Sequence, residues 1–180
     1  PVRLALLNPN VHYHEVHVPE YPLFHYQPYE LALSSKLVDM VKLYKIDVLH
    51  VHYAIPHAYA GYMAKQMLAD EGIHIPMVTT LHGTDITLVG NHPFYKPAVS
   101  FSINKSDVVT SVSQSLKDDT YRLFDIKNEI DVIPNFIELN KDKLKENIPC
   151  HRSLMAPDNE KIITHISNFR KVKRIDDIVR

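Results

Sequence analysis

The chain has 180 residues, of which 45% are hydrophobic and 23% charged, and its net charge is −1 at pH 7. This composition is typical of a globular protein of one domain or slightly more, and it gives no indication of nucleic-acid binding. No apolar run approaches the roughly 20 residues of a membrane-spanning helix, so stable membrane insertion is not expected. Because Cys150 is the single cysteine, an internal disulfide is excluded and a reducing, cytoplasmic location is expected.

Apolar or β-branched runs alternate with segments of helical periodicity along the first three quarters of the chain. Strands are predicted at residues 11–18, 46–52, 76–81, 107–112 and 130–133. Helices are predicted from about 28 to 44, from about 56 to 70, at 96–105, and after Ser113, a typical N-cap residue. The strands are near-continuous apolar runs, which is typical of a parallel sheet covered by helices on both faces. The sequence therefore predicts an α/β fold.

A charged segment with two prolines, residues 138–160, interrupts this alternation and predicts a linker in which a short helix can form. A fresh apolar run, Lys161–Ile166, then predicts the first strand of a second α/β unit, residues 161–180, followed by its first helix. The first unit is expected to span residues 1–137. The chain opens at Pro1 and stops within a helical pattern, so we expect it to be a segment of a longer protein.

Small polar residues end the strand predicted at residues 76–81, with the sequence His82-Gly83-Thr84-Asp85. In an open α/β sheet, ligands bind just beyond the carboxyl ends of the strands, so this turn is a candidate binding site. The alternative is a purely structural turn, in which Gly83 supplies a positive φ and Asp85 caps the segment that follows.

The stretch from His52 to His57 likewise lies between a predicted strand and a predicted helix. Free N–H groups at the helix start and the Tyr53 hydroxyl could bind an anion there. A tyrosine packed under a loop explains the same pattern equally well.

Twelve histidines raise the question of a metal site. His50 and His52 share one face of a predicted strand, and residues 14–17 are one residue short of the His-Glu-x-x-His zinc motif. No cysteine or carboxylate cluster completes a ligand set at helical or turn spacing. We therefore expect no metal, and most histidines are interpreted as ordinary core or surface residues.

Four cations, Arg170, Lys171, Lys173 and Arg174, lie in the turn between the strand and helix predicted for the second unit. The start of a helix favours negative charge, so basic residues there indicate a phosphate or diphosphate site. Solvated surface charge is the usual alternative. The four glycines form no Gly-rich phosphate loop, so either the protein binds no nucleotide or that loop lies outside this chain.

With these motifs, the sequence resembles the family-4 retaining glycosyltransferases, which have two Rossmann-like domains facing each other across a cleft, the GT-B fold. The stretches that carry the resemblance are residues 49–58, 79–87, 107–113, 135–138 and 165–174. The resemblance implies that the chain contains most of the N-terminal, acceptor-side domain and the start of the C-terminal, sugar-nucleotide domain. The first strand with its Gly-rich loop, and most of the second domain, would then be missing.

Within the family, the resemblance is strongest to the enzymes that begin bacillithiol biosynthesis. It implies transfer of N-acetylglucosamine from UDP-N-acetylglucosamine to the hydroxyl of L-malate, with retention of the α configuration. These two small molecules would be the substrates, and neither a cofactor nor a metal would be needed. Oligomeric state is left open, a homo-oligomer included, and the fragment alone is expected to be inactive.

The resemblance also implies roles for individual residues. His82 would lie against the transferred sugar, and Arg170 and Lys173 would neutralise the departing UDP. Tyr53 would hydrogen-bond a malate carboxylate, and Asn168 the diphosphate or the acceptor. Thr84, Asp85 and Lys171 would support substrate binding.

Three alternatives remain from the sequence. One is a family-4 glycosyltransferase with a different acceptor, such as a lipid, an inositol phosphate or a glycan. The helix predicted at residues 96–105 contains no arginine to pair with a dicarboxylate, with Ser100 or Ser102 standing where one would serve, which keeps this alternative open. The others are a non-catalytic sugar-nucleotide or anion-binding module and a histidine-based metal hydrolase.

Overall fold

The structure is a computed structural model that describes residues 8–20, 22–23, 25–137, 151–168 and 170–179. The chain divides into two units, Pro1–Phe136 and Ile137–Arg180. Among the described residues, none of the helices is both long enough and apolar enough to cross a membrane.

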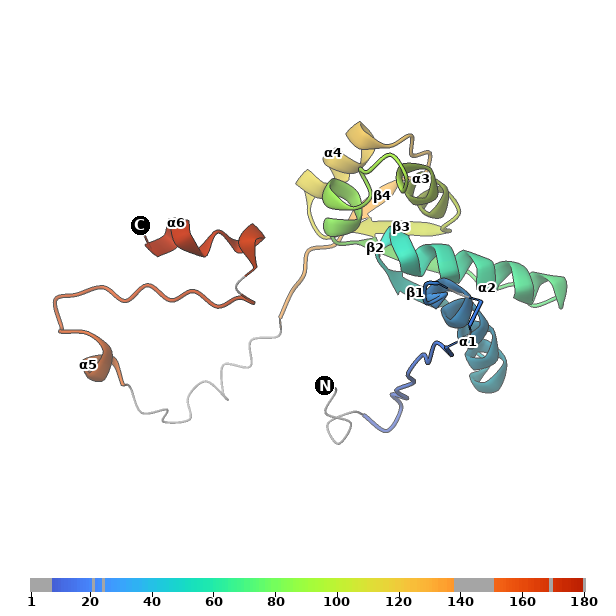
Figure 1. Cartoon of the computed structure of the whole chain (residues 1–180), viewed down its shortest axis with the longest axis horizontal. Coiled ribbons are helices and arrows are strands. Elements are labelled where there is room, and N and C mark those ends of the chain that lie inside the picture. Colours follow the sequence, from blue (N-terminus) through green and yellow to red (C-terminus); the bar gives the residue numbers. More distant parts are fainter. Residues whose placement is uncertain (1–7, 21, 24, 138–150, 169, 180) are drawn as a thin grey trace. The chain divides into compact units, whose positions relative to one another are not determined.

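A four-stranded parallel sheet forms the centre of the first unit (Figure 1). Its strands are β1 (Leu49–His52), β2 (Met77–Leu81), β3 (Val108–Ser111) and β4 (Ile130–Val132), adjacent in the order β1-β2-β3-β4. In this register His52 lies beside Thr80, and Thr80 beside Thr110. The prediction of an α/β fold with a Rossmann-like parallel sheet is confirmed.

Helices alternate with these strands: α1 (Tyr29–Tyr44), α2 (Tyr59–Asp70), α3 (Lys96–Asn104) and α4 (Gln114–Leu123). Figure 1 shows α1 and α2 beside β1, and α3 and α4 beside β3 and β4. The helix starts follow the expected signals, since α1 begins directly after Pro28 and the Ser113 hydroxyl accepts a hydrogen bond of 3.1 Å from the Leu116 N–H. The four helices predicted in this unit are confirmed.

The apolar core of the first unit lies on one face of the sheet. Because side chains alternate along a strand, the parallel register places Leu49, Met77, Val109 and Ile130 on the same face, and all four are buried. They pack with buried side chains of the helices, including Leu68 of α2, Ile103 of α3 and Leu116 of α4. The opposite face carries polar side chains from three neighbouring strands, and these extend toward the candidate site.

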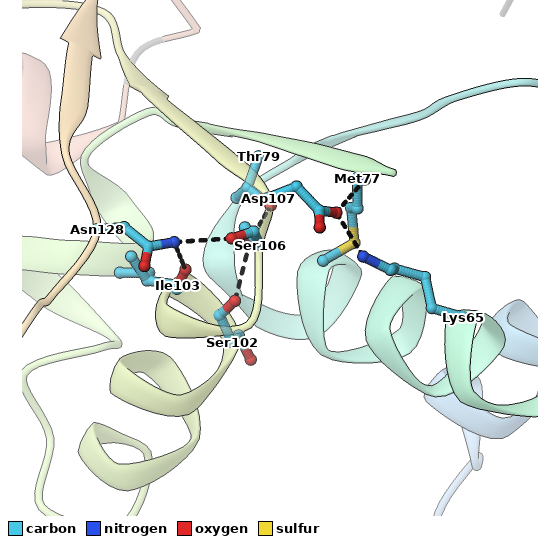
Figure 2. A network of polar contacts seen from close by, with 8 residues as sticks. All are labelled: Lys65, Met77, Thr79, Ser102, Ile103, Ser106, Asp107 and Asn128. Atoms are coloured by element: carbon cyan, nitrogen blue, oxygen red, sulfur yellow. Dashed lines mark hydrogen bonds and ion pairs between the residues drawn. The ribbon is translucent and has the colours of Figure 1, made fainter. Parts of the chain in front are cut away.

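A polar network joins α2 to the amino ends of β2 and β3 (Figure 2). The Asp107 carboxylate accepts a hydrogen bond of 2.6 Å from the Met77 N–H and forms an ion pair with Lys65. The Asn128 side chain donates to the Ser106 carbonyl at 2.7 Å. Because this network lies at the end of the sheet away from the candidate site, we assign it to stability.

Two predicted strands are wrong. Residues 11–18 form no strand, and the rings of His12 and His14 lie against Tyr44 at centroid distances of 4.9 and 5.4 Å. Residues 161–166 also have no strand assignment, and Ile166 is 91% exposed. β-prone residues form a stable strand only where a neighbouring strand satisfies their backbone groups.

The second unit contains short elements: α5 (Arg152–Met155), a single 3₁₀ turn (Lys171–Lys173) and α6 (Ile175–Val179). α5 lies within the predicted linker, of which residues 138–150 are outside the described part of the chain. The predicted helix after the basic residues is present as α6.

Candidate active site

The candidate site lies at the carboxyl ends of β1 and β2, where each strand runs into a wide turn with an i to i+5 hydrogen bond. Ala58 N–H donates to the Tyr53 carbonyl at 3.2 Å, and Val89 N–H to the Thr84 carbonyl at 2.9 Å. The turns span Ala54–Ala58 and Thr84–Leu88. Such π-type turns are frequent at functional sites, because they widen the backbone and redirect side chains.

Asp85 holds these two turns together. Its carboxylate accepts hydrogen bonds from the Ala54 N–H at 2.8 Å, the Gly83 N–H at 3.0 Å and the His82 N–H at 3.3 Å. The residue is only 3% exposed. Gly90 packs so closely against this turn that a Cβ atom there would overlap the Asp85 carbonyl oxygen. The structure thus directs the Asp85 carboxylate to the backbone and gives it a positioning role.

His52 and His82 form a direct pair across the two strands. His52 Nδ1 lies 2.8 Å from His82 Nε2, so one nitrogen donates a hydrogen bond to the other. From the sequence, most histidines are interpreted as ordinary residues, and the contact between His52 and His82 is not predicted. The signal that could have revealed it is the position of each histidine as the last residue of a parallel strand or the first beyond it, because the carboxyl ends of adjacent parallel strands lie together.

Tyr53 lies beside this pair. Its φ of 76° is rare for a residue other than glycine, and the ring centroid is 4.8 Å from that of His82. His57 donates from Nδ1 to the His52 carbonyl, 2.6 Å away, and its ring lies 6.0 Å from that of Tyr53. Strained backbone of this kind persists where the surroundings impose it, which is common at binding sites.

A chain of polar contacts extends from the histidines across the polar face of the sheet. The His50 ring stacks on His52 with centroids 4.8 Å apart, and His50 Nε2 lies 2.8 Å from the Thr80 hydroxyl. Thr80 in turn lies 2.7 Å from the Thr110 hydroxyl. The sequence missed both threonines, since β-branched residues in an apolar run indicate only a strand.

The environment of His52 favours its neutral form. Partial burial, followed by the nearby rings of His50, His82 and His57, lowers the pKa of His52 below its ordinary value. A neutral imidazole keeps a lone pair, so the His52 ring can accept as well as donate a hydrogen bond.

The predicted site residues thus fall into two groups, one in each unit. In the first unit, the structure brings Tyr53 and His82 together, places Thr84 at the surface and directs Asp85 inward. In α3, Ser102 is fully buried and donates to the Ala98 carbonyl at 2.7 Å, so it is not positioned to bind an acceptor.

In the second unit, Asn168, Arg170, Lys171 and Lys173 are exposed. A hollow of about 490 Å³ is lined by Arg170, Lys171, Arg174, Ile175, Asp176 and Asp177. Arg174 forms an ion pair with Asp177, and both aspartates lie in the first turn of α6. The negative charges of these two aspartates interact favourably with the positive end of the helix dipole. They therefore offset the unfavourable effect of the basic residues that precede α6.

A model of the family described as Glycosyltransferase Family 4 matches residues 3–141. The chain belongs to glycosyltransferase family 4. The resemblance inferred from the motifs is therefore confirmed, and the carboxyl-end turns of β1 and β2 both lie inside the matched region.

Curated relatives agree with the family. An N-acetyl-alpha-D-glucosaminyl L-malate synthase of Bacillus anthracis is 45% identical over the whole chain, which covers 46% of that protein. A putative teichuronic acid biosynthesis glycosyltransferase, TuaC, of Bacillus subtilis (strain 168) is 26% identical over 84% of the chain, which covers 38% of that protein. The chain thus spans about half the length, or less, of the curated relatives it matches.

Among the residues that the structure describes, no three histidine, cysteine, aspartate or glutamate side chains form a group that could hold a metal ion. The histidines of the site bond to one another, to Thr80 and to the His52 carbonyl.

Proposed function

We propose that the protein containing this chain transfers N-acetylglucosamine from UDP-N-acetylglucosamine to the hydroxyl of L-malate, with retention at the anomeric carbon. The observation that carries the proposal is the 45% identity, along all 180 residues, to the N-acetyl-alpha-D-glucosaminyl L-malate synthase of Bacillus anthracis. Family membership supports the reaction class, and the detailed match along the chain supports the donor and the acceptor.

In the proposed reaction, the bond between the anomeric carbon and the UDP oxygen breaks, and UDP leaves with the electron pair. The malate hydroxyl oxygen bonds to the same carbon on the same face, and its proton passes to the departing phosphate oxygen. No enzyme nucleophile is needed, so the site requires no closely spaced pair of carboxylates of the glycosidase kind. No redox step occurs and the transferred group comes from the sugar nucleotide itself, so the proposed reaction needs no redox cofactor.

In the first unit, His82 would contact the transferred sugar, and Tyr53 a malate carboxylate. Their adjacent rings, at the open end of the sheet, support these roles, because aromatic and imidazole faces pack against sugars while their polar atoms bond hydroxyls or carboxylates. Thr84 is exposed at the start of its turn and can add a hydroxyl group. Asp85 would act indirectly by holding both turns.

In the second unit, Arg170 and Lys173 would stabilise the charge that develops on the departing UDP, with Lys171 and Asn168 adding donors to the diphosphate. Among the described residues, Arg170, Lys171 and Lys173 form no ion pair, whereas Arg174 pairs with Asp177. These three cations are therefore available to bind an anion. Charge-assisted hydrogen bonds to phosphate are stronger than neutral ones.

The test is a transfer assay with the full-length protein and radiolabelled UDP-N-acetylglucosamine. We expect labelled product with L-malate and none with an inositol phosphate or a glycan acceptor. His82→Ala should abolish most of the transfer, and His74→Ala, the same change at an exposed histidine before β2, should not. Transfer to another acceptor but not to malate would refute the proposed acceptor, and UDP binding without any transfer would refute the proposed activity.

A further inference from the structure

The pairing of His52 with His82 restricts which nitrogen of His82 can meet a ligand. His82 Nε2 is occupied by His52 Nδ1 at 2.8 Å, and the two ring centroids are 5.0 Å apart. Within the described residues, no protein group bonds to His82 Nδ1. A ligand that forms a hydrogen bond with the His82 ring would therefore do so at Nδ1.

Whether His82 Nδ1 donates or accepts depends on the proton shared between the two rings. If His52 Nδ1 carries that proton, both neutral rings must adopt the Nδ1–H tautomer. If His82 Nε2 carries it, both rings adopt the Nε2–H tautomer, which is the more stable form of a neutral histidine side chain. The second arrangement satisfies the same hydrogen bond with both rings in their preferred form.

The surroundings of His52 are compatible with a ring that accepts a hydrogen bond from His82. Its ring stacks on His50, and its carbonyl accepts the hydrogen bond from His57. Burial, with the rings of His50, His82 and His57, lowers the pKa of His52 and so favours its neutral ring, in which one nitrogen has a lone pair. The Asp85 carboxylate, which could otherwise attract a proton to His82, is occupied by three backbone N–H groups.

We propose that His52 is a positioning residue that holds His82 as its Nε2–H tautomer, so that His82 presents Nδ1 to the ligand as a hydrogen-bond acceptor. An acceptor nitrogen bonds a hydroxyl group, which has a proton to give. It does not bond an ionised phosphate or carboxylate, which has none. The identification of this hydroxyl as one that belongs to the transferred sugar rests on the proposed function.

The tautomer can be measured directly in the full-length protein without substrates, by long-range ¹H–¹⁵N NMR of the histidine rings at neutral pH. We expect His82 to show a protonated Nε2 and an unprotonated Nδ1. His52→Ala should disturb this pattern, whereas His52→Asn should keep it, because the asparagine Oδ1 lies near the position of the lost Nδ1 and accepts the same hydrogen bond. His74→Ala is the matched control and should leave His82 unchanged.

Kinetics give a second readout. We expect His52→Ala to lower kcat about tenfold, the effect of one misdirected hydrogen bond, and His52→Asn to recover most of it, with the KM for the acceptor unchanged in both. A wild-type His82 found as the Nδ1–H tautomer or as the imidazolium would overturn the proposal, as would a His82 spectrum unaffected by His52→Ala. Because the NMR experiment uses no substrate, it decides the tautomer even if transfer to malate fails.

Discussion

The backbone N–H of Ala54 donates a hydrogen bond of 2.8 Å to Asp85 Oδ2, and this contact ties the turn after β1 to the turn after β2. The two residues are 31 positions apart in the sequence. Together with the pairing of β1 and β2, in which the Tyr53 N–H donates to the Thr80 carbonyl at 2.9 Å, this tie fixes the position of Tyr53 relative to His82.

Asp85→Ala should therefore be strongly destabilising. The substitution leaves three backbone N–H groups without their charged acceptor inside a turn that is largely closed to water, which costs about 3 kcal/mol. Urea unfolding of the full-length protein would measure it. Asp70→Ala, the same change at an exposed position of α2, should stay within about 0.5 kcal/mol of the wild type, and an equal effect of both would contradict the role of Asp85.

Gly90→Ala should disturb the same turn by a different route. An added Cβ would overlap the Asp85 carbonyl oxygen, so the backbone must shift, and we expect a loss of about 2–3 kcal/mol in the free energy of unfolding. Gly72→Ala is the comparison: its φ of +79° is strained for alanine, but nothing lies within 4 Å of the new atom. That change should cost only about 1 kcal/mol. The reverse order would show that close packing at Gly90 is unimportant.

The environment of Asp107 predicts that the folded protein loses stability in acid. Burial raises the pKa of this carboxyl, but the hydrogen bonds from Lys65 and the Met77 N–H outweigh it, so the pKa lies below its ordinary value. The unfolded chain then binds the proton first, and the stabilisation, present at neutral pH, is lost as the pH falls below about 4. The difference in unfolding free energy between wild type and Asp107→Asn should shrink over this range. A constant difference would exclude the ion pair as its source.

The environment of His52 predicts a second dependence of folding stability on pH, in a higher pH range. Because its pKa is lowered in the folded state, the unfolded chain binds more protons below about pH 6.5, so folding stability decreases as the pH falls through that value toward the folded pKa. His52→Asn removes the titrating ring. Urea unfolding between about pH 7.5 and 5 should show a smaller decrease for this variant, and parallel curves would argue against a perturbed His52.

Lys173→Ala tests the basic turn of the second unit. In the full-length protein we expect turnover to fall about a hundredfold, as for other groups that stabilise developing negative charge. Lys161→Ala, an exposed lysine outside the turn, serves as the control in the same transfer assay. Turnover within about twofold of the wild type in Lys173→Ala would remove this residue from the diphosphate site.

The alternation of strands and helices, and the cap at Ser113, could be predicted from the sequence because periodicity and capping are local properties of the chain. The candidate turns could also be located, since polar residues that end an apolar strand mark the carboxyl edge of a parallel sheet. Residues 11–18 and 161–166 show the limit of local patterns, because β-prone residues become a strand only beside another strand.

Only the tertiary structure shows which residues each side chain contacts. His52 and His82 are 30 residues apart and meet because β1 and β2 are adjacent and parallel, and Asp85 points inward because the unpaired N–H groups of both turns converge on it. Residue types and spacing indicate which groups are available for chemistry. Strand order and register decide which of them touch, because hydrogen bonds act over about 3 Å and only tertiary packing brings distant residues that close.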